Sequence, residues 1–205
     1  MLKLLYMIKL LEEDIMYIEQ LLKKKPIIAA IKDIDDLSDI PKDKIDIIFV
    51  LRGKLSNLNN IVKKAEELDK LVFLHIDMVK GIASDSEAIK YLAQEIGIDG
   101  IVTTKSRLIK DAKKENLITV QRLFLLDSES LKTGINIVKS TKPDFVEVLP
   151  GAVIPELIGE LKQELDIPII AGGLIKESSQ VKELLKGDIL AISTSRKGLW
   201  NSDFN

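Results

Sequence analysis

The sequence predicts an α/β fold: a (β/α)8 TIM-like barrel of near-minimal size with an extra N-terminal amphipathic helix. Apolar runs alternate with amphipathic stretches eight times, about 22 residues apart, as in a β/α repeat. The runs are rich in Ile, Val and Leu, which is typical of parallel strands buried on both faces. A Gly-Gly pair ends the seventh run and small hydroxyl residues end the eighth, where such barrels bind phosphate. The alternative, an open doubly wound sheet, normally has a glycine-rich loop after an early strand, and the sequence has none.

The composition limits the classes of protein and site. The 205 residues suffice for one domain with a full core, which must be aliphatic because only 4% of residues are aromatic. The absence of Cys excludes disulfides and thiolate metal sites, and it fits a cytoplasmic protein. The single His leaves little material for a metal site, so we expect no metal and no cofactor. A net charge of −2 gives no overall positive field, so any nucleic-acid contact must use a local patch.

Residues 1–24 form a segment of their own. Apolar residues recur every three or four positions and predict one face of a helix: Leu4, Ile8, Leu11, Ile15, Ile18 and Leu22. The apolar start is too short to span a bilayer and no cleavage site follows it, so we expect no membrane segment and no signal peptide. Three roles stay open: the helix covers the closed end of the barrel, pairs with a partner, or extends upstream of a later start site. Residues 25–205 are expected to form a single barrel domain.

The first half of the chain is expected to supply four strands and three helices. Each predicted strand is a short apolar run, and each predicted helix has apolar residues at helical spacing. The strands are 26–31, 45–51, 71–76 and 100–102, and the helices are 55–69, 84–96 and 107–115. Ser84 with Glu87 fits a capping box, and Gly97 suits the position just past that helix.

The second half continues the same alternation. The predicted strands are 117–120, 145–148, 167–171 and 189–192, and the predicted helices are 128–140, 154–165 and 178–185, with a short one at Leu199 and Trp200. Asp127 or Ser128 suits the N-cap of the first of these helices. Pro155 is tolerated because it falls in the first turn of its helix.

Glycine and hydroxyl residues at the ends of the last two strands predict a phosphate site. Function in such a barrel lies at the carboxyl ends of the strands, so these residues are expected to meet at one mouth. Glycines let the backbone approach an anion closely, and the hydroxyl residues offer further donors. The predicted phosphate-binding residues are Gly172, Gly173, Ser193, Thr194 and Ser195. A plain tight turn is the alternative for the glycine pair.

Titratable residues at the other strand ends are predicted to face the rest of the ligand: Lys32, His75, Asp77, Lys105, Arg122 and Glu147. Lys32 and Arg52 have an ordinary rim position as the alternative. His75 and Asp77 are two apart, so on a strand they point to the same face. Glu147 stands in an apolar run, and burial without a partner is costly, so it should meet Arg122, Lys105 or ligand hydroxyls. The two sets together predict a site for a small phosphorylated polyol.

No catalytic constellation stands out, so we assign no catalytic residue. Lys105 is the only attractive nucleophile, and Asp77 with Glu147 supplies too few carboxylates for a metal-assisted phosphodiesterase. A barrel enzyme acting on a small phosphorylated polyol is the alternative function. A third hypothesis is a metabolite-binding module that docks a protein through residues 1–24. Self-association into a homo-oligomer is left open.

Six segments, collinear between about Pro26 and Trp200, carry a resemblance: F-L-H-I-D-M-V-K-G-I (73–82), D-G-I-V-T-T-K-S (99–106), Q-R-L-F-L-L-D-S (121–128), P-D-F-V-E-V-L-P-G (143–151), I-P-I-I-A-G-G-L-I (167–175) and A-I-S-T-S (191–195). They resemble the glycerol-3-phosphate-responsive antiterminator family, the bacterial glycerol uptake operon antiterminator regulatory proteins. The third and fourth segments are specific, whereas A-G-G-L-I alone fits many phosphate-binding barrels. The resemblance implies a non-catalytic, ligand-sensing barrel that binds glycerol 3-phosphate as its effector. It also implies action on the leader mRNA of glycerol-utilisation genes, where premature transcription termination is prevented.

RNA binding has no independent support from the residues. The chain has few aromatic residues, no recognisable RNA-binding motif and a slightly negative net charge. Local basic patches are therefore the only candidates, and we expect RNA contacts at Arg196, Lys197, Lys113 and Lys114. The first two directly follow the predicted phosphate site. A solvated helix face is the alternative for each patch.

Overall fold

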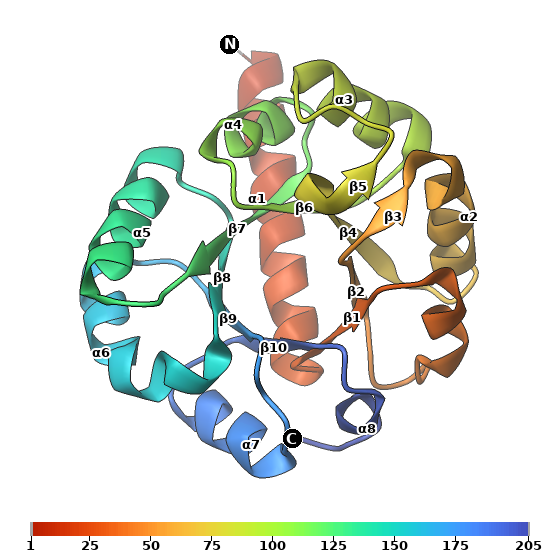
Figure 1. Cartoon of the computed structure of the whole chain (residues 1–205). Helices are drawn as coiled ribbons and strands as arrows, with labels where there is room; N and C mark the ends of the chain where they lie inside the picture. Colours follow the sequence, from red (N-terminus) through yellow and green to blue (C-terminus); the bar gives the residue numbers. More distant parts are fainter. Residues whose placement is uncertain (1, 205) are drawn as a thin grey trace.

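The computed structural model describes the backbone of residues 2–204 and the side chains of residues 13–204. Eight parallel strands close into a barrel in the order β1-β10-β9-β8-β7-β6-β4-β2, which confirms the predicted fold class (Figure 1). Closure pairs the first strand with the last, with Ile27 beside Ile192. The barrel strands are β1 (Ile27–Ile31), β2 (Ile47–Val50), β4 (Leu71–His75), β6 (Gly100–Thr103), β7 (Ile118–Phe124), β8 (Phe145–Leu149), β9 (Ile169–Gly172) and β10 (Ala191–Thr194).

All eight predicted strands are present, but most of their ends differ from the prediction, by one to four residues. β7 continues to Phe124, so Arg122 lies inside a strand and not just beyond one. β4 ends at His75, and Asp77 belongs to the following 3-10 turn η2 (Ile76–Met78). β10 begins and ends two residues later than predicted. The largest difference, in β7, arises because apolar periodicity assigns polar residues to loops even where a barrel interior buries them.

The helices lie outside the barrel, as predicted, with small shifts at their ends. They are α2 (Leu55–Glu66), α3 (Ser86–Tyr91), α4 (Ser106–Lys114), α5 (Ser128–Thr141), α6 (Ile154–Glu164), α7 (Ser178–Lys186) and α8 (Lys197–Trp200). A π-helix, η3 (Leu92–Ile96), continues α3, and η1 (Ile34–Asp39) and η4 (Gly151–Val153) are short 3-10 helices. Asp127 caps α5, accepting from the Ser130 N–H at 2.7 Å. The capping box predicted at Ser84 is wrong, because Asp85 is the N-cap of α3 and accepts from the Ala88 N–H at 2.9 Å.

A small parallel sheet that the sequence did not predict lies on the mouth side of the barrel. β3 (Gly53–Lys54) follows β2 and β5 (Val79–Lys80) follows β4 and its turn, and the two strands pair side by side (Figure 1). The register places Lys54 directly beside Lys80. Each strand is two residues long and has no alternating pattern that could reveal it.

Apolar side chains fill both the barrel and the space between the barrel and its helices. All five residues of β1 are buried, as expected for a strand covered on both faces. Inside the barrel, the rings of Phe49 and Phe73 pack with centroids 5.7 Å apart. Outside it, residues such as Ile61 of α2 and Val181 of α7 belong to a second, larger cluster. The core is aliphatic with few aromatic residues, as the composition indicated.

Helix α1 (Leu2–Lys24) crosses the amino end of the barrel (Figure 1). Ile18 and Leu22 are 4% and 2% exposed and pack against the cluster inside the barrel. Of the three roles left open, the C-terminal half of the helix therefore performs the first, covering the closed end. The predicted apolar positions Leu4, Ile8 and Leu11 lie outside the residues whose side chains are described. Within residues 2–204, no helix combines the length and apolar character needed to cross a bilayer.

Candidate functional site

A cavity of about 340 Å³ opens at the carboxyl end of the barrel, and we call it the mouth cavity. Residues from the ends of β1, β7, β8, β9 and β10 line it. It gathers seven of the predicted ligand-binding residues: Lys32, Arg122, Glu147, Gly173, Ser193, Thr194 and Ser195. Leu51, Leu149, Lys176 and Arg196 complete much of the wall.

The turn after β9 and the loop after β10 form the open side of the mouth cavity. Gly173 has φ 73°, a left-handed conformation that favours glycine, and it is an exposed residue that lines the cavity. The loop after β10 is fixed from behind, because the Trp200 indole N–H donates to the Thr194 carbonyl at 2.8 Å. The Arg196 N–H donates to the Thr194 hydroxyl at 3.2 Å, which shapes the turn that carries Ser195.

Gly172 has a different role from the one predicted. It is buried in β9 and does not line the mouth cavity. A Cβ added there would stand 2.7 Å from both the Glu147 Oε1 and the Ser193 Oγ. The missing side chain therefore makes room for a contact between two other strands, while Gly173 is the glycine that faces the cavity.

Glu147 is fully buried at the base of the mouth cavity and is doubly bound. Its Oε2 accepts from the Arg122 Nε at 2.6 Å, and its Oε1 accepts from the Ser193 hydroxyl. The register of β7 and β8 puts Arg122 directly beside Glu147, so both side chains point into the barrel. The prediction that Glu147 meets Arg122 is confirmed. Because one charge compensates the other, the pair tolerates burial that neither residue would tolerate alone.

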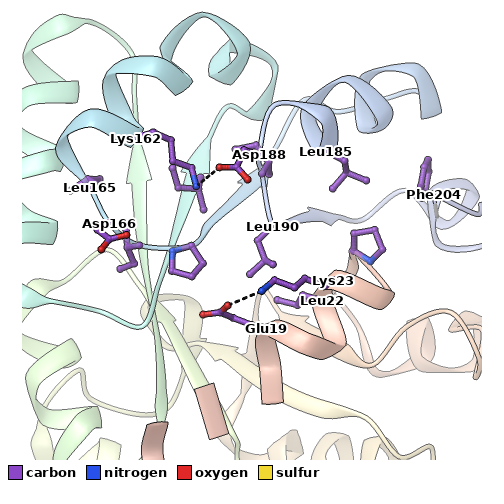
Figure 2. Close-up of a pocket in the computed structure, with 15 residues that line it drawn as sticks. Glu19, Leu22, Lys23, Lys162, Leu165, Asp166, Leu185, Asp188, Leu190 and Phe204 are labelled. Atoms are coloured by element: carbon purple, nitrogen blue, oxygen red, sulfur yellow. Dashed lines mark hydrogen bonds and ion pairs between the residues drawn. The ribbon is translucent and has the colours of Figure 1, made fainter. Parts of the chain in front are cut away.

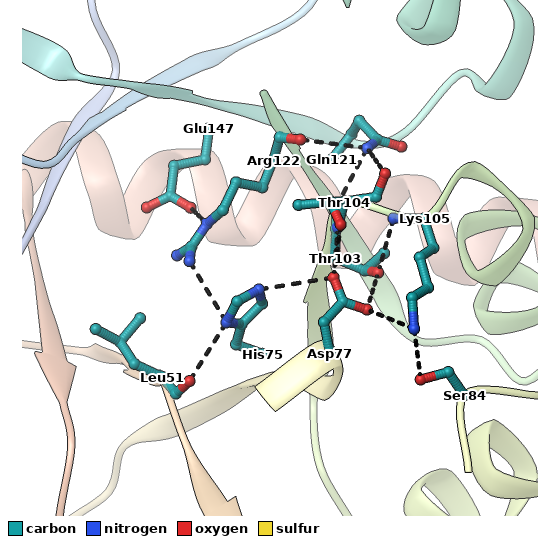
Figure 3. A network of polar contacts seen from close by, with 10 residues as sticks. All are labelled: Leu51, His75, Asp77, Ser84, Thr103, Thr104, Lys105, Gln121, Arg122 and Glu147. Carbon is teal, nitrogen blue, oxygen red and sulfur yellow. Dashed lines mark hydrogen bonds and ion pairs between the residues drawn. The ribbon is translucent and has the colours of Figure 1, made fainter. Parts of the chain in front are cut away.

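His75 extends this network from the Arg122 guanidinium toward Asp77 (Figure 3). Its Nδ1 lies 3.4 Å from the Arg122 Nη1 and 3.3 Å from the Leu51 carbonyl oxygen. Its buried Nε2 has no hydrogen-bond partner among the described residues and lies 3.7 Å from the Asp77 Oδ2. Burial lowers the pKa of His75, and the nearby positive charge of Arg122 lowers it further. The imidazole is therefore neutral at pH 7.

Asp77 is occupied by residues of the protein. Its oxygens accept from the Thr103 hydroxyl at 2.9 Å, the Thr104 N–H at 2.8 Å and the Thr104 hydroxyl at 2.9 Å (Figure 3). Burial alone would raise the pKa of Asp77, but these hydrogen bonds outweigh it and hold the pKa below its usual range. Lys105 approaches Asp77 at 3.8 Å and donates to the Ser84 hydroxyl at 2.9 Å.

The structure thus divides the predicted polyol-facing set into two groups. Lys32, Arg122 and Glu147 line the mouth cavity, whereas His75, Asp77 and Lys105 lie beside it and reach it only through Arg122. Asp77, which was predicted to face the ligand, does not line the mouth cavity, and its carboxylate accepts three hydrogen bonds from the protein. The prediction that His75 and Asp77 share a strand face also fails, because the strand ends at His75.

Sequence reasoning missed Gln121 and Lys176. Gln121 is fully buried in β7, and its amide donates to the Thr103 and Thr104 carbonyls at 3.2 and 3.1 Å. The charge of Arg122 in an apolar run identified it as a candidate site residue. The neighbouring Gln121 has no charge, so the sequence indicates its role less strongly. Lys176 lines the mouth cavity, three residues after Gly173, and its position directly after the glycine turn could have identified it.

The four residues expected to bind RNA do not form one patch. The Lys197 ammonium lies 2.7 Å from both Asp36 and Asp39, and these carboxylates raise its pKa. Lys113 is paired with Asp144, and Lys114 with Asp111, each at 2.9 Å. Helices run antiparallel to the strands, so the end of α4 that carries Lys113 and Lys114 lies at the far end of the barrel from Arg196. Arg196 lines the mouth cavity.

A larger cavity, of about 780 Å³, lies at the amino end of the barrel between α1, α6 and α7 (Figure 2). Its two lysines are already paired, Lys23 with Glu19 at 3.3 Å and Lys162 with Asp188 at 3.1 Å. Function in this fold lies at the opposite end, so we assign the site to the smaller mouth cavity. Among the described residues, no three His, Asp or Glu side chains are grouped to hold a metal ion.

Comparisons with known proteins find relatives that cover most of this chain. A crystal structure of the glycerol uptake operon antiterminator regulatory protein from Listeria monocytogenes is 36% identical, with a TM-score of 0.83, covering 87% of this chain and 96% of that one. A glycerol uptake operon antiterminator-related protein from Thermotoga maritima is 36% identical, with a TM-score of 0.78, covering 87% of this chain and 99% of that one. The uncharacterized protein YgcP of Escherichia coli K12 is 33% identical over 180 residues, which are 88% of this chain and 94% of YgcP.

More distant structures share only the fold. Orotidine 5′-phosphate decarboxylase from Pyrococcus horikoshii is 18% identical with a TM-score of 0.63, so it supports the barrel and nothing about the site.

Residues 27–200 match the model of one family, described as glycerol-3-phosphate responsive antiterminator. This match spans nearly the whole barrel, including every residue of the mouth cavity named above. The chain belongs to the glycerol-3-phosphate responsive antiterminator family.

Proposed function

We propose that this protein is a transcription antiterminator that binds glycerol 3-phosphate in the mouth cavity. In the ligand-bound state it binds the leader mRNA of glycerol-utilisation genes and prevents premature termination. The family supports the regulatory role, and the RNA target is the step that the proposal adds. The observation that carries the proposal is the mouth cavity itself, with cations and a glycine turn above a buried Arg122–Glu147 pair.

The open side of the mouth cavity suits a phosphate. Lys32, Lys176 and Arg196 line it, and the charged side-chain group of none of them forms an ion pair with a described carboxylate. A phosphate monoester carries a charge of about −1.5 to −2 at pH 7, which these cations can neutralise. Exposed backbone at Gly173 and Ser195 can donate to its oxygens without interference from a large side chain.

The base of the mouth cavity suits the hydroxyls of glycerol. An ionised carboxylate has about four lone-pair sites, and Glu147 uses one on each oxygen. Glu147 therefore retains capacity to accept from a ligand hydroxyl. The volume of about 340 Å³ is near the lower end of the range for ligand pockets, which favours a three-carbon ligand over a larger one.

The same geometry favours a sensor over an enzyme. Glu147 is the only carboxylate lining the mouth cavity in the described part of the chain, and Arg122 and Ser193 hold it in place. Lys105, the only attractive nucleophile in the sequence, lies outside the cavity and donates to Ser84. Acid–base chemistry requires a group within hydrogen-bond reach of the reacting atom, and beside Glu147 the described lining of the cavity offers cations and hydroxyls but no second carboxylate and no imidazole.

Ligand binding is tested by isothermal titration calorimetry and thermal denaturation with glycerol 3-phosphate, glycerol, inorganic phosphate and dihydroxyacetone phosphate. At a concentration of 100 Kd, glycerol 3-phosphate should stabilise the fold by about 2.7 kcal/mol. For a chain of this size, that shift corresponds to a rise in Tm of about 5–10 °C. Lys176→Gln should weaken binding, whereas Lys182→Gln, an equal charge change on exposed α7, should not.

RNA binding is tested by fluorescence anisotropy with the leader transcript, with and without glycerol 3-phosphate. Tighter RNA binding in the presence of the ligand is the expected result, because coupling between two sites is reciprocal. An RNA affinity that is the same with and without glycerol 3-phosphate would overturn the proposal. Tighter binding of inorganic phosphate than of glycerol 3-phosphate would overturn it as well. Turnover of glycerol 3-phosphate into a product would instead support the enzyme alternative.

A further inference from the structure

A second cavity, of about 370 Å³, adjoins the mouth cavity over the loops that follow β1, β2 and β4. We call it the lysine groove, and its main lining residues are Lys32, Arg52, Lys54, Asn57, Met78 and Lys80. We propose that the lysine groove binds the sugar–phosphate backbone of the RNA target. The inference rests on the proposed function for the identity of the polyanion as RNA.

The cations of the lysine groove are not neutralised by the protein. Lys32, Arg52, Lys54 and Lys80 are all exposed, and no ion pair with a described carboxylate involves any of them. Asp33 is the one acidic residue of the wall, and its carboxylate is engaged as the N-cap of η1. Four uncompensated positive charges around one groove repel one another and attract a polyanion.

The backbone holds two of these cations together. The parallel register of β3 and β5 places Lys54 directly beside Lys80, a pairing of like charges that destabilises a sheet. Adjacent strands lie about 4.8 Å apart, so the backbone positions of Lys54 and Lys80 are held close together. A bound phosphate between them removes this repulsion, which gives the small sheet a binding role that packing does not explain.

The groove contrasts with three of the four basic residues that the sequence suggested for RNA. Lys113, Lys114 and Lys197 each have a carboxylate within 3 Å, so their charges are already compensated. Releasing any of them to RNA would break an existing ion pair. The lysine groove involves no such cost, and we therefore place the RNA contacts there.

The chemistry of the groove favours RNA over a protein or a membrane. Protein interfaces have an apolar or aromatic centre, and the only large apolar side chain exposed in this groove is Met78, at 54%. A membrane surface would likewise need several apolar side chains to insert beside the cations. The lysine and arginine side chains of the groove can donate to the phosphates of an RNA backbone, and Met78 can pack against a base.

Lys32 belongs to both cavities, so it joins the two binding events. Its ammonium has three donors and can contact two phosphates at once. A ligand phosphate in the mouth cavity would order this side chain before RNA arrives. RNA would then lose less conformational entropy on binding, which gives positive coupling without a large structural change.

The test compares two double variants of the full chain in the presence of saturating glycerol 3-phosphate. Lys54→Gln/Lys80→Gln removes two groove charges, and Lys63→Gln/Lys64→Gln removes two exposed charges from the last turn of α2, at the far end of the barrel. Anisotropy with the labelled leader transcript is measured over a salt series, and calorimetry measures ligand binding separately. A phosphate contact to single-stranded RNA contributes about 0.7 to the salt slope, which is about 0.7 decade of affinity at about 0.1 M salt.

The groove variant should therefore bind RNA about 25-fold more weakly at about 0.1 M salt, with a salt slope lower by about 1.4. Its glycerol 3-phosphate affinity should match that of the unmodified chain, and the α2 variant should match it in both assays. Equal RNA affinity of the groove variant, or an equal loss in the α2 variant, would overturn the groove while leaving the proposed function intact. The assignment of RNA to the groove would also be wrong if the unmodified chain bound no RNA. It would be wrong as well if the groove variant lost binding to phosphatidylserine vesicles but not to RNA. An unmodified chain that binds RNA but not glycerol 3-phosphate would contradict the proposed function alone, since groove binding of RNA would still be measurable.

Discussion

The buried pair of Arg122 and Glu147 gives a sharp prediction about stability. In Arg122→Met, the carboxylate of Glu147 stays buried and loses its opposite charge, since the two residues are 8% and 0% exposed. Breaking a buried pair in this way costs about 3–5 kcal/mol of unfolding free energy. For a chain of this size, the loss corresponds to a fall in Tm of about 6–20 °C.

Urea unfolding followed by the fluorescence of the single tryptophan, Trp200, measures this cost directly. Lys139→Met is the matched control, because its partner Glu164 is half exposed and such surface pairs contribute under about 1 kcal/mol. The double variant Arg122→Met/Glu147→Gln should recover much of the loss, because it removes the stranded charge. A cost for Arg122→Met no larger than that of Lys139→Met would refute the reasoning. The reasoning would also be refuted if the double variant lost as much unfolding free energy as the two single variants lose together.

Three further predictions concern single residues. Gly172→Ala should destabilise the fold by about 1–3 kcal/mol, because its Cβ would stand 2.7 Å from Glu147 and Ser193. The control Gly159→Ala in α6, where nothing lies within 4 Å of the added Cβ, should be neutral or stabilising. Equal shifts in Tm for the two variants would count against the packing argument. In a proton NMR titration, the imidazole of the single histidine, His75, should titrate with a midpoint below pH 6.5. The unfolded chain then binds a proton more readily than the folded one, so the unfolding free energy should fall as the pH drops from 6.5 through that midpoint, and less so in His75→Gln. A midpoint at or above pH 6.5 would contradict the burial argument. Lys32→Gln should weaken the binding of both glycerol 3-phosphate and RNA, measured by calorimetry and anisotropy, whereas a loss of only one would show that the two cavities do not share this side chain.

The architecture was predictable because its main determinant is a local pattern. Each barrel strand is a short run of Ile, Val and Leu, and the helices between them have apolar residues at helical spacing. Strand ends were less predictable, since Gln121 and Arg122 are polar residues within a strand and their partners come from other strands. The β3/β5 sheet has no pattern at all, because two loops that meet in space create it.

The site was predictable at the level of which residues stand at strand ends, and less so at the level of contacts. Seven predicted residues line one cavity because parallel strands end on one side of a barrel. Occupancy by other protein groups cannot be predicted from the sequence. Thr103 and Thr104 donate three hydrogen bonds to Asp77 from 26 and 27 residues away in the chain, and no sequence pattern reveals these contacts. The same holds for the compensated lysines, since Lys197 meets a carboxylate 158 residues distant in the chain.

The pairing of β1 with β10 has a consequence for protein synthesis. The mouth cavity takes Lys32 from the loop after the first strand and Ser195 from the loop after the last. Because the ribosome makes the chain from the N-terminus, the cavity cannot be assembled until almost the entire sequence has been translated and released. If the mouth cavity binds the effector as proposed, a nascent chain, or one that ends before Ser195, lacks part of the binding site. Such truncated products would then be unable to respond to the effector.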